Sequence, residues 1–276
     1  MTTDIRLAGV IGDPVAHSRS PRLHGHWIKR YGLRGYYVPL HVRRDDLEQV
    51  LQMLPKMGFS GVNVTIPHKE NVLHLADTIT DRAALIGAAN TLTFTANGAI
   101  QADNTDGIGF LANLRQAIDG WHGSVGPALV LGAGGAAKAI VSALLSDGAP
   151  QVIVVNRTRG RAEALKDHFG ARVYVKDWTQ ISDVLRDVAL LVNTTSLGMT
   201  GQPPLVLDLT RLRRPTVVAD IVYTPLQTPL LIDAAAWGCA TVDGLGMLLH
   251  QAAPGFERWF GCTPEVDDDL RQAVLA

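Results

Sequence analysis

Two short polar segments hold the side chains best suited to acid/base chemistry. In residues 61–69, Gly-Val-Asn-Val-Thr-Ile-Pro-His-Lys, alternating apolar residues predict a buried strand that Pro67 ends, and Lys69 follows it. Asp106 lies in the second segment, residues 102–107. Ligands of open α/β sheets bind at the carboxyl ends of strands. A lysine beside a carboxylate could exchange a proton with the hydroxyl oxygen of an alcohol. The residues alone do not decide whether Lys69 or Asp106 takes this proton.

Neutral polar side chains could complete such a site. Ser18 and Ser20 precede a helix that Pro21 starts, so they could bind a small carboxylate, or one of them simply caps the helix. Asp106 has a competing interpretation as part of an Asn-Thr-Asp-Gly turn. The candidates for binding hydroxyl groups are Asn63, Thr65, Asn90, Asp106 and Gln251. This lining favours a polyol acid over a phosphorylated or apolar ligand.

A glycine-rich turn predicts a dinucleotide site. Gly132-Ala133-Gly134-Gly135-Ala136 lies between a strand over 128–131 and an alanine-rich helix to about 145, with another strand over 152–155. Glycines let a pyrophosphate approach the backbone at a helix N-terminus, although a purely structural turn is the alternative. NAD sites usually place a carboxylate after the second strand, where this chain has Asn-Arg-Thr-Arg-Gly-Arg at 156–161. Three guanidinium groups favour the 2′-phosphate of NADP over a merely solvated helix start.

The composition indicates a soluble α/β protein with a sizeable core. Of 276 residues, 47% are hydrophobic and 18% charged, and the net charge of −1 with no dense basic run argues against nucleic-acid binding. Residues 128–145 are apolar but contain Lys138 and the glycines, so we interpret them as strand, turn and helix, not as a membrane span. No cysteine or histidine spacing matches a metal site, and no signal peptide is recognisable. We therefore expect a cytoplasmic protein that binds neither metal nor membrane.

Strands and helices alternate, which predicts two α/β domains with mainly parallel sheets. The expected strands cover 7–11, 36–41, 61–66, 128–131 and 152–155, with a hairpin of 91–95 and 100–103 around Asn97-Gly98. The expected helices begin at 21 and cover 45–56, 71–75, 81–86 and 109–118. After Asp106, a helix leads to a new strand-turn-helix unit that starts at residue 128. This change predicts a domain boundary near residue 107.

Taken together, the motifs resemble those of the shikimate dehydrogenase family. The matching segments are Val10-Ile-Gly-Asp-Pro-Val-Ala-His-Ser-Arg-Ser-Pro21, Asn63-Val-Thr-Ile-Pro-His-Lys69, Gly87-Ala-Ala-Asn-Thr91, Asp103-Asn-Thr-Asp-Gly107, Gly132-Ala-Gly-Gly-Ala136, Asn156-Arg-Thr158, Asn193-Thr-Thr-Ser-Leu-Gly-Met199, Asp220-Ile-Val-Tyr223, and Asp243-Gly-Leu-Gly-Met247 with Gln251. They run in order from near residue 8 to about residue 265. Departures such as Gly25, Thr224 and Gln227 touch no proposed ligand residue.

The resemblance implies an NADP-dependent enzyme that reversibly reduces 3-dehydroshikimate to shikimate in aromatic amino-acid biosynthesis. It also implies a discontinuous substrate domain, residues 1–107 plus 244–276, and an inserted Rossmann-type NADP domain, residues 108–243. Lys69 and Asp106 would be the catalytic pair. The implied substrate residues are Ser18, Ser20, Asn63, Thr65, Asn90, Tyr223 and Gln251. The implied cofactor residues are Gly132, Ala133, Gly134, Gly135, Ala136, Asn156, Arg157, Thr158, Arg161, Thr194, Gly244 and Met247.

Two alternatives remain at this level. One is a paralogue that oxidises quinate or an aminoshikimate, with NAD as its cofactor. The other is a catalytically silent protein that binds shikimate-type metabolites, which would have no need of Lys69, Asp106 and the cofactor motifs together. The sequence leaves the oligomeric state open between a monomer and a homodimer.

Overall fold

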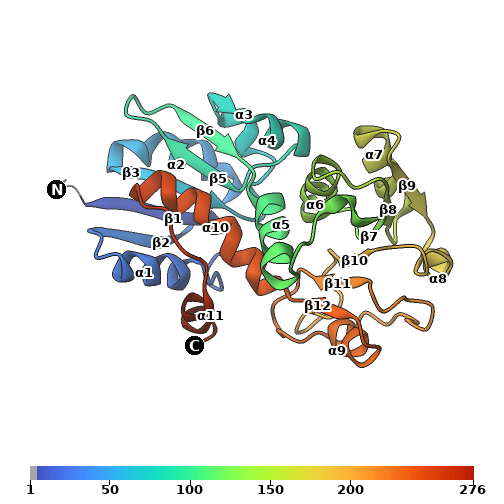
Figure 1. Cartoon of the computed structure of the whole chain (residues 1–276). Helices are drawn as coiled ribbons and strands as arrows, with labels where there is room; N and C mark the ends of the chain where they lie inside the picture. Colours follow the sequence, from blue (N-terminus) through green and yellow to red (C-terminus); the bar gives the residue numbers. More distant parts are fainter. Residues whose placement is uncertain (1–4) are drawn as a thin grey trace. The chain divides into compact units, whose positions relative to one another are not determined.

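The computed structural model describes residues 5–276, which divide into two compact units. The first unit comprises the described residues up to Thr105 together with Leu249–Ala276, and the second unit is Asp106–Leu248. In Figure 1 the first unit runs from blue to cyan and ends in red, and the second runs from green to orange. These divisions lie within a few residues of the bounds expected after 107 and before 244.

The first unit is built on a mixed sheet with the strand order β2-β1-β3-β5-β6-β4. Its strands are β1 Arg6–Gly12, β2 Gly35–His41, β3 Phe59–Val64, β4 Thr78–Ile79, β5 Thr91–Phe94 and β6 Ile100–Asp103. β1 is parallel to both β2 and β3, whereas β5 is antiparallel to β3 and to β6. The predicted hairpin is therefore confirmed, and helical crossovers join the parallel strands as their geometry requires.

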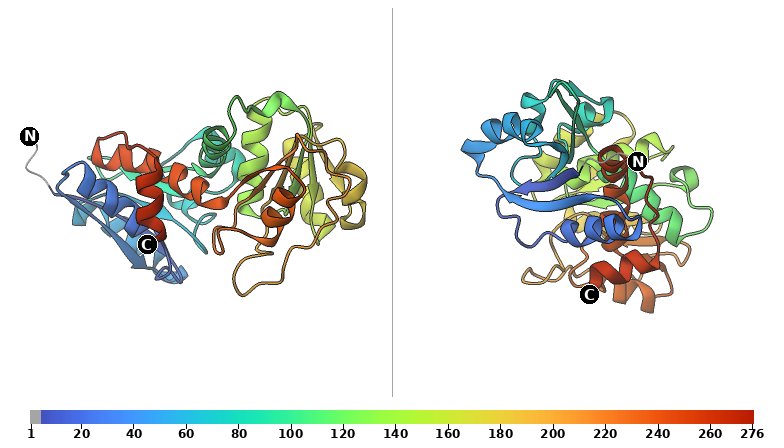
Figure 2. Two further views of the ribbon diagram at one scale, coloured as in Figure 1. Left: turned by 60° about the horizontal axis from the view of Figure 1, so that its bottom comes forward. Right: turned by 90° about the vertical axis from the view of Figure 1, so that its left-hand side faces the viewer.

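Helices cover both faces of this sheet. On one face, Val62 and Val64 of β3 pack in a core with residues of α2 Leu47–Met53, α3 Val72–Leu75 and α4 Asp81–Ile86. On the other face, α1 Ser20–Arg30 and the later part of α10 Gly244–Phe260 contribute aromatic rings. α11 Asp268–Leu275 packs against α1 (Figure 2). The close approach of α10 requires glycine at position 61, where a Cβ would lie 2.0 Å from Nε1 of Trp259.

Several predicted elements differ in extent, such as the helix expected over 109–118, which begins at Asp106 and ends at Ala117, and proline explains one of the differences. The helix expected over 45–56 is divided into a 3₁₀ turn Arg44–Asp46, α2, and a second 3₁₀ turn Pro55–Met57. α2 ends before Pro55 because a proline ring disrupts an α-helix. The strand expected over 61–66 ends at Val64, and Ile66 is 73% exposed. Beyond Val64 the chain turns, with the His68 amide donating to the Thr65 carbonyl oxygen at 3.0 Å.

The second unit has a fully parallel sheet in the order β12-β11-β10-β7-β8-β9. Its strands are β7 Ala128–Leu131, β8 Val152–Val155, β9 Val173–Lys176, β10 Leu190–Asn193, β11 Val217–Asp220 and β12 Ala240–Val242. This is the order of doubly wound dinucleotide-binding folds, in which the direction of winding reverses between the first and fourth strands of the unit, here β7 and β10. The predicted α/β architecture is confirmed.

Alternate residues of each buried strand supply the two cores of the second unit. Ala128 and Val130 of β7 pack with α5 Asp106–Ala117, α6 Gly135–Ser146 and α7 Arg159–Phe169. Leu129 and Leu131 point to the opposite core, which includes residues of α8 Ile181–Val184 and α9 Pro229–Ala236. Such near-continuous apolar strands are expected where helices cover both faces of a parallel sheet. Within the described residues, no helix combines the length and apolarity needed to cross a membrane.

Candidate functional site

The carboxyl end of β3 and the segment before β5 form the polar centre of the first unit. The Val64 amide donates to the Asn90 carbonyl oxygen at 2.8 Å, and the Ala89 amide donates to the Lys69 carbonyl oxygen at 2.8 Å. These two bonds tie the loop that carries Lys69 to the segment that carries Asn90. The structure thus brings together two predicted motifs, residues 63–69 and residues 87–91.

Amide side chains in this centre bond to one another. The Asn63 side chain is buried, and its Nδ2 donates to the Asn90 carbonyl oxygen at 3.1 Å and to Thr91 Oγ1 at 3.3 Å. Asn90 Nδ2 donates to Gln251 Oε1 at 3.0 Å. Asn90 Oδ1 accepts from the Thr105 amide at 2.9 Å. Three of the predicted substrate residues, Asn63, Asn90 and Gln251, therefore belong to one hydrogen-bonded group within the first unit.

The serines lie at the start of α1. Ser18 Oγ accepts from the Ser20 amide at 3.3 Å, so its hydroxyl bonds the first residue of α1. A hydroxyl that accepts this bond still has a proton to donate to a carboxylate. Ser20 itself is buried. Thr65 follows β3 directly, is partly buried, and donates its backbone amide to the Ile11 carbonyl oxygen at 3.0 Å.

A buried carboxylate next to this centre was missed by the sequence reasoning. Asp103 is 1% exposed and accepts from Arg82 Nε at 2.6 Å, Arg258 at 2.6 Å and Thr80 Oγ1 at 2.8 Å. Burial alone would raise the pKa of Asp103, but the bonds from Arg82, Arg258 and Thr80 outweigh it and lower the pKa to about 2. This charged group fixes the end of β6, from which Asn104 and Thr105 continue.

Asp106 lies in the second unit, where it is buried and is the first residue of α5. The alternative interpretation of residues 104–107 as an isolated turn is therefore wrong. A carboxylate is stabilised at this end of a helix by the helix dipole. Tyr223 also belongs to the second unit and follows β11 by three residues.

The glycine turn after β7 has the properties that a pyrophosphate needs. Gly132 has a φ of +115°, and a Cβ there would lie 2.5 Å from Thr194 Oγ1, so only glycine fits. Around Gly134 and Gly135 a Cβ would meet nothing within 4 Å, which leaves room for a ligand. The N-cap residue of α6 is Gly134, which has no side chain to bond the amides of the first turn. The backbone amides of its first turn can therefore receive an anion.

The three arginines after β8 are not equivalent. Arg159 is held by Glu163 at 2.9 Å and by Asp177 at 2.7 Å. Arg157 and Arg161 are exposed, and neither forms an ion pair within residues 5–276. Asn156 Nδ2 donates to the Thr158 carbonyl oxygen at 2.8 Å, which shapes the loop. Two of the three guanidinium groups are therefore available to a phosphate, and the third is engaged in structural ion pairs.

A second buried carboxylate joins the loops after β10 and β11. Asp220 is 2% exposed and accepts from Asn193 Nδ2 at 2.9 Å, Thr228 Oγ1 at 2.8 Å and the Val222 amide at 3.0 Å. Burial raises the pKa of Asp220 to about 6, and the three hydrogen bonds only partly oppose it, because no cation is among its bonded partners. Thr194, predicted to lie near the nicotinamide, directly follows Asn193.

The last two predicted cofactor residues have structural roles at the start of α10. A Cβ at position 244 would lie 2.2 Å from the Ile221 carbonyl oxygen, so the helix can begin here only with glycine. Met247 is buried and packs in the core of the second unit. Asn113, which the sequence reasoning did not identify, donates to the Asp243 carbonyl oxygen at 2.8 Å and holds the residue before this helix.

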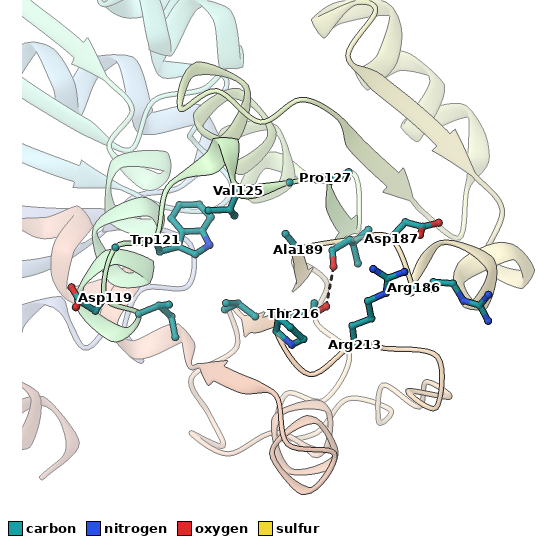
Figure 3. A pocket seen from close by; sticks show the side chains of 15 residues that line it. Asp119, Trp121, Val125, Pro127, Arg186, Asp187, Ala189, Arg213 and Thr216 are labelled. Carbon is teal, nitrogen blue, oxygen red and sulfur yellow. Dashed lines mark hydrogen bonds between the residues drawn. The ribbon is translucent and has the colours of Figure 1, made fainter.

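A cavity of about 440 Å³ lies elsewhere in the second unit (Figure 3). Trp121, Arg186 and Arg213 line it, together with Pro127, the residue before β7. It is therefore at the amino ends of the strands, whereas the glycine turn is at their carboxyl ends. Ligands of doubly wound sheets bind at the carboxyl ends, so this cavity is not the candidate site. Within residues 5–276, no group of three His, Cys, Asp or Glu side chains is arranged to hold a metal ion.

The fold and the glycine turn define the class of the protein: a dinucleotide-binding α/β protein in which a Rossmann-type unit is joined to a separate α/β unit. Family models match three successive parts of the chain. They describe the shikimate dehydrogenase substrate binding domain over residues 10–92, shikimate/quinate 5-dehydrogenase over 119–222 and the shikimate 5′-dehydrogenase C-terminal domain over 244–275.

Whole-chain comparisons agree with the models. A protein of Jannaschia sp. named shikimate dehydrogenase (NADP(+)) is 73% identical over 100% of both chains. The structure of quinate dehydrogenase from Corynebacterium glutamicum in complex with NAD has a TM-score of 0.91 at 31% identity over 99% of both chains. Shikimate 5-dehydrogenase from Thermus thermophilus, in complex with NADP(H) and shikimate, gives 0.86 at 36% identity over 99% of both chains. The chain belongs to the shikimate dehydrogenase family.

The raised pKa of Asp220 predicts a pH-dependent stability. Because the pKa is higher in the folded state than the ordinary value of 3.8, the stabilisation is full below about pH 4 and is lost as the pH rises through about 6. Relative to Asp220→Asn, the wild-type free energy of unfolding should fall by about 2 kcal/mol between pH 4.5 and 7.5. Urea unfolding at a series of pH values measures this, with exposed Asp119→Asn as the control. A difference that stays constant over this range would contradict the prediction.

Proposed function

We propose that this chain catalyses the reversible NADPH-dependent reduction of 3-dehydroshikimate to shikimate, a step of chorismate and aromatic amino-acid biosynthesis. The observation that carries the proposal is that one chain of this family has both an open, uncapped dinucleotide turn and the polar group around Asn90. We assign substrate binding to residues 1–107 with 244–276, and cofactor binding to residues 108–243. We assign its action to the cytoplasm, where thiols such as those of Cys239 and Cys262 stay reduced. The protein would act as a monomer or a homodimer.

Ser18 and Ser20 bind the substrate carboxylate in this proposal, with Tyr223 as a further contact. Support comes from the Ser18 hydroxyl, which accepts from a backbone amide at the start of α1 and keeps its own proton for a donor bond. Thr65, Asn90 and Gln251 bind the ring hydroxyl groups. Asn63 supports these residues, since its side-chain amide is buried and donates to Asn90 and Thr91.

Lys69 and Asp106 form the acid/base pair that exchanges one proton with the reacting oxygen, and bound NADPH supplies the hydride. Two connections support the pairing. The loop of Lys69 is tied to residues 89–90, and Thr105, which directly precedes Asp106, bonds to Asn90. Asp106 orients the ammonium group, and the carboxylate is itself stabilised by the N-terminus of α5.

The cofactor lies on the second unit in this proposal. Residues 132–136 bind the pyrophosphate through backbone amides, as the room around Gly134 and Gly135 allows. The 2′-phosphate is bound by Asn156, Arg157, Thr158 and Arg161. Thr194 and Gly244 shape the nicotinamide end, and Met247 supports it from the core. Thr194 is well fixed for this role, because its Oγ1 donates to the Leu131 carbonyl oxygen at 2.7 Å.

An assay of the purified protein with shikimate or quinate, each with NADP or NAD, tests the proposal. Appearance of the reduced cofactor, followed by its absorbance, should be fastest with shikimate and NADP. A preference for quinate or NAD would move the chain to the activity of the quinate paralogue. Absence of turnover with every pair, combined with measurable shikimate binding, would support the silent binding protein instead.

Lys69→Ala should lower kcat by about a hundredfold or more and leave the affinity for NADP nearly unchanged, because it removes an acid/base group and no cofactor contact. Steady-state kinetics measure the first effect and fluorescence titration of NADPH the second. Lys56→Ala, an exposed lysine of the same unit, is the matched control. Retained turnover in the Lys69 variant would remove this lysine from the mechanism.

Arg157→Ala should weaken NADP binding at least about tenfold and change NAD binding little, because a charged bond to the 2′-phosphate is lost. Arg159→Ala is the control from the same loop, since Arg159 already pairs with Glu163 and Asp177. Dissociation constants for both cofactors are measured for both variants. An equal loss for NADP and NAD would place Arg157 away from the 2′-phosphate.

A further inference from the structure

A chain of side-chain hydrogen bonds runs through the first unit from Tyr37 to Gln251. Tyr37 Oη donates to Asn63 Oδ1 at 2.7 Å, and Asn63 Nδ2 donates to Thr91 Oγ1 at 3.3 Å. Thr91 Oγ1 donates to Asn90 Oδ1 at 2.9 Å, and Asn90 Nδ2 donates to Gln251 Oε1 at 3.0 Å. Every donor therefore points in the same direction, from Tyr37 toward Gln251. We call these five residues the relay.

Backbone groups fix the direction of the relay at two points. A carbonyl oxygen only accepts, so the bond at 3.1 Å to the Asn90 carbonyl requires Nδ2 on that side of Asn63. A backbone amide only donates, so the bond at 2.9 Å from Thr105 requires Oδ1 on that side of Asn90. With both amides fixed in this way, the Thr91 hydroxyl can only accept from the Asn63 side chain, and toward the Asn90 side chain it can only donate. Its oxygen also lies 3.3 Å from Thr105 Oγ1, whose own hydroxyl donates to Asn90 Oδ1 at 3.1 Å.

At the other end of the relay, ring stacking and burial hold Tyr37 in place. The Tyr37 ring is stacked on His24, with centroids 3.9 Å apart and planes 4° from parallel. Burial raises the pKa of Tyr37 well above 10, opposed by Ser20, so the phenol keeps its proton. Burial lowers the pKa of His24 to about 3, opposed by the Asn63 side chain, so the ring stays neutral. A neutral, buried pair of rings thus supplies the first donor.

We propose that Tyr37 and Thr91 are positioning residues for the reaction proposed above. Neither is a substrate-binding candidate, and Thr91 is fully buried. They act by holding the amides of Asn90 and Gln251 in one orientation. Because Gln251 Oε1 accepts from Asn90, its Nε2 lies on the opposite side of that amide. Together with the Thr105 amide, the relay therefore holds the side-chain atoms of Asn90 and Gln251 that would meet the hydroxyl groups of a polyol acid.

Thr91→Val is the central test, because valine has the shape of threonine without its hydroxyl. Loss of this hydroxyl should raise KM and the calorimetric dissociation constant for shikimate about tenfold, the scale of one hydrogen bond, with the KM for NADP unchanged. We expect kcat to change less than about threefold, because Lys69 and Asp106 remain. Thr91→Ser should restore substrate binding, and Tyr37→Phe should weaken it in the same direction as Thr91→Val.

Thr93→Val is the matched control. Thr93 lies two residues further along β5, so its side chain points to the same face of the sheet, and its buried Oγ1 has no hydrogen-bond partner in the part of the chain that the structure describes. Removal of the Thr93 hydroxyl should leave kcat, both KM values and the dissociation constant for shikimate as in the wild type. If Thr91→Val binds substrate as Thr93→Val does, or if Thr91→Ser fails to restore binding, the relay has no positioning role.

This inference rests on the proposed function, and the two can fail separately. The calorimetric comparison uses whichever acid, shikimate or quinate, the wild-type protein binds. A wild-type protein that prefers quinate would overturn the proposed substrate, yet a tenfold difference between Thr91→Val and Thr93→Val on quinate would still support the relay. Wild-type turnover of shikimate with equal binding by these two variants would overturn only the relay.

Discussion

The first unit depends on the burial of Asn90, a polar residue that bonds three separate segments: β3, the end of β6 with the residues after it, and α10. Its carbonyl oxygen accepts from Val64 and from Asn63, and its amide donates to the Asp103 carbonyl oxygen. Its side chain bonds Thr105 and Gln251. Each buried polar group of Asn90 that lost its partner would cost about 1–3 kcal/mol of stability. The folded state therefore favours the arrangement of segments that makes all of these bonds. The same bonds that stabilise the fold thereby set the geometry of the candidate substrate site.

Each unit contains a buried carboxylate at the end of a strand, and the two carboxylates have different hydrogen-bond partners. Asp103 is neutralised by two arginines from α4 and α10, which stabilises its charge and fixes the end of β6. Asp220 has only neutral donors among its bonded partners, so burial is only partly opposed and its pKa is raised to about 6. Each carboxylate lies at the carboxyl end of a strand and holds the loop that follows. Structural acids therefore lie next to both candidate sites, where they organise the loops without contacting a ligand in the proposed mechanism.

Most of the fold could be predicted from the sequence because it follows from local patterns. The strands of the second unit, β7 and β8 above all, are short apolar runs bounded by glycine or polar residues, and both were predicted to the residue. The helix expected over 45–56 was wrong because its apolar pattern continues past Pro55 while the backbone cannot. Arg258 and Asp103 could not be paired from sequence, since their contact depends on how α10 returns to the first sheet. The resemblance supplied residue roles that spacing alone left open.

Burial and hydrogen bonding distinguish, within two motifs of this chain, residues that support the structure from residues that could bind a ligand. In residues 63–69, the Asn63 amide is fully enclosed by Tyr37, Asn90 and Thr91, whereas Thr65 is only partly buried. In residues 156–161, Arg159 is taken up by two carboxylates, whereas Arg157 carries no ion pair within the described residues. The residue types within each motif are similar, so sequence alone treats them alike. In these two motifs, the internal bonds of Asn63 and Arg159, more than residue type, separate them from Thr65 and Arg157, which the proposed function assigns to the substrate and the cofactor.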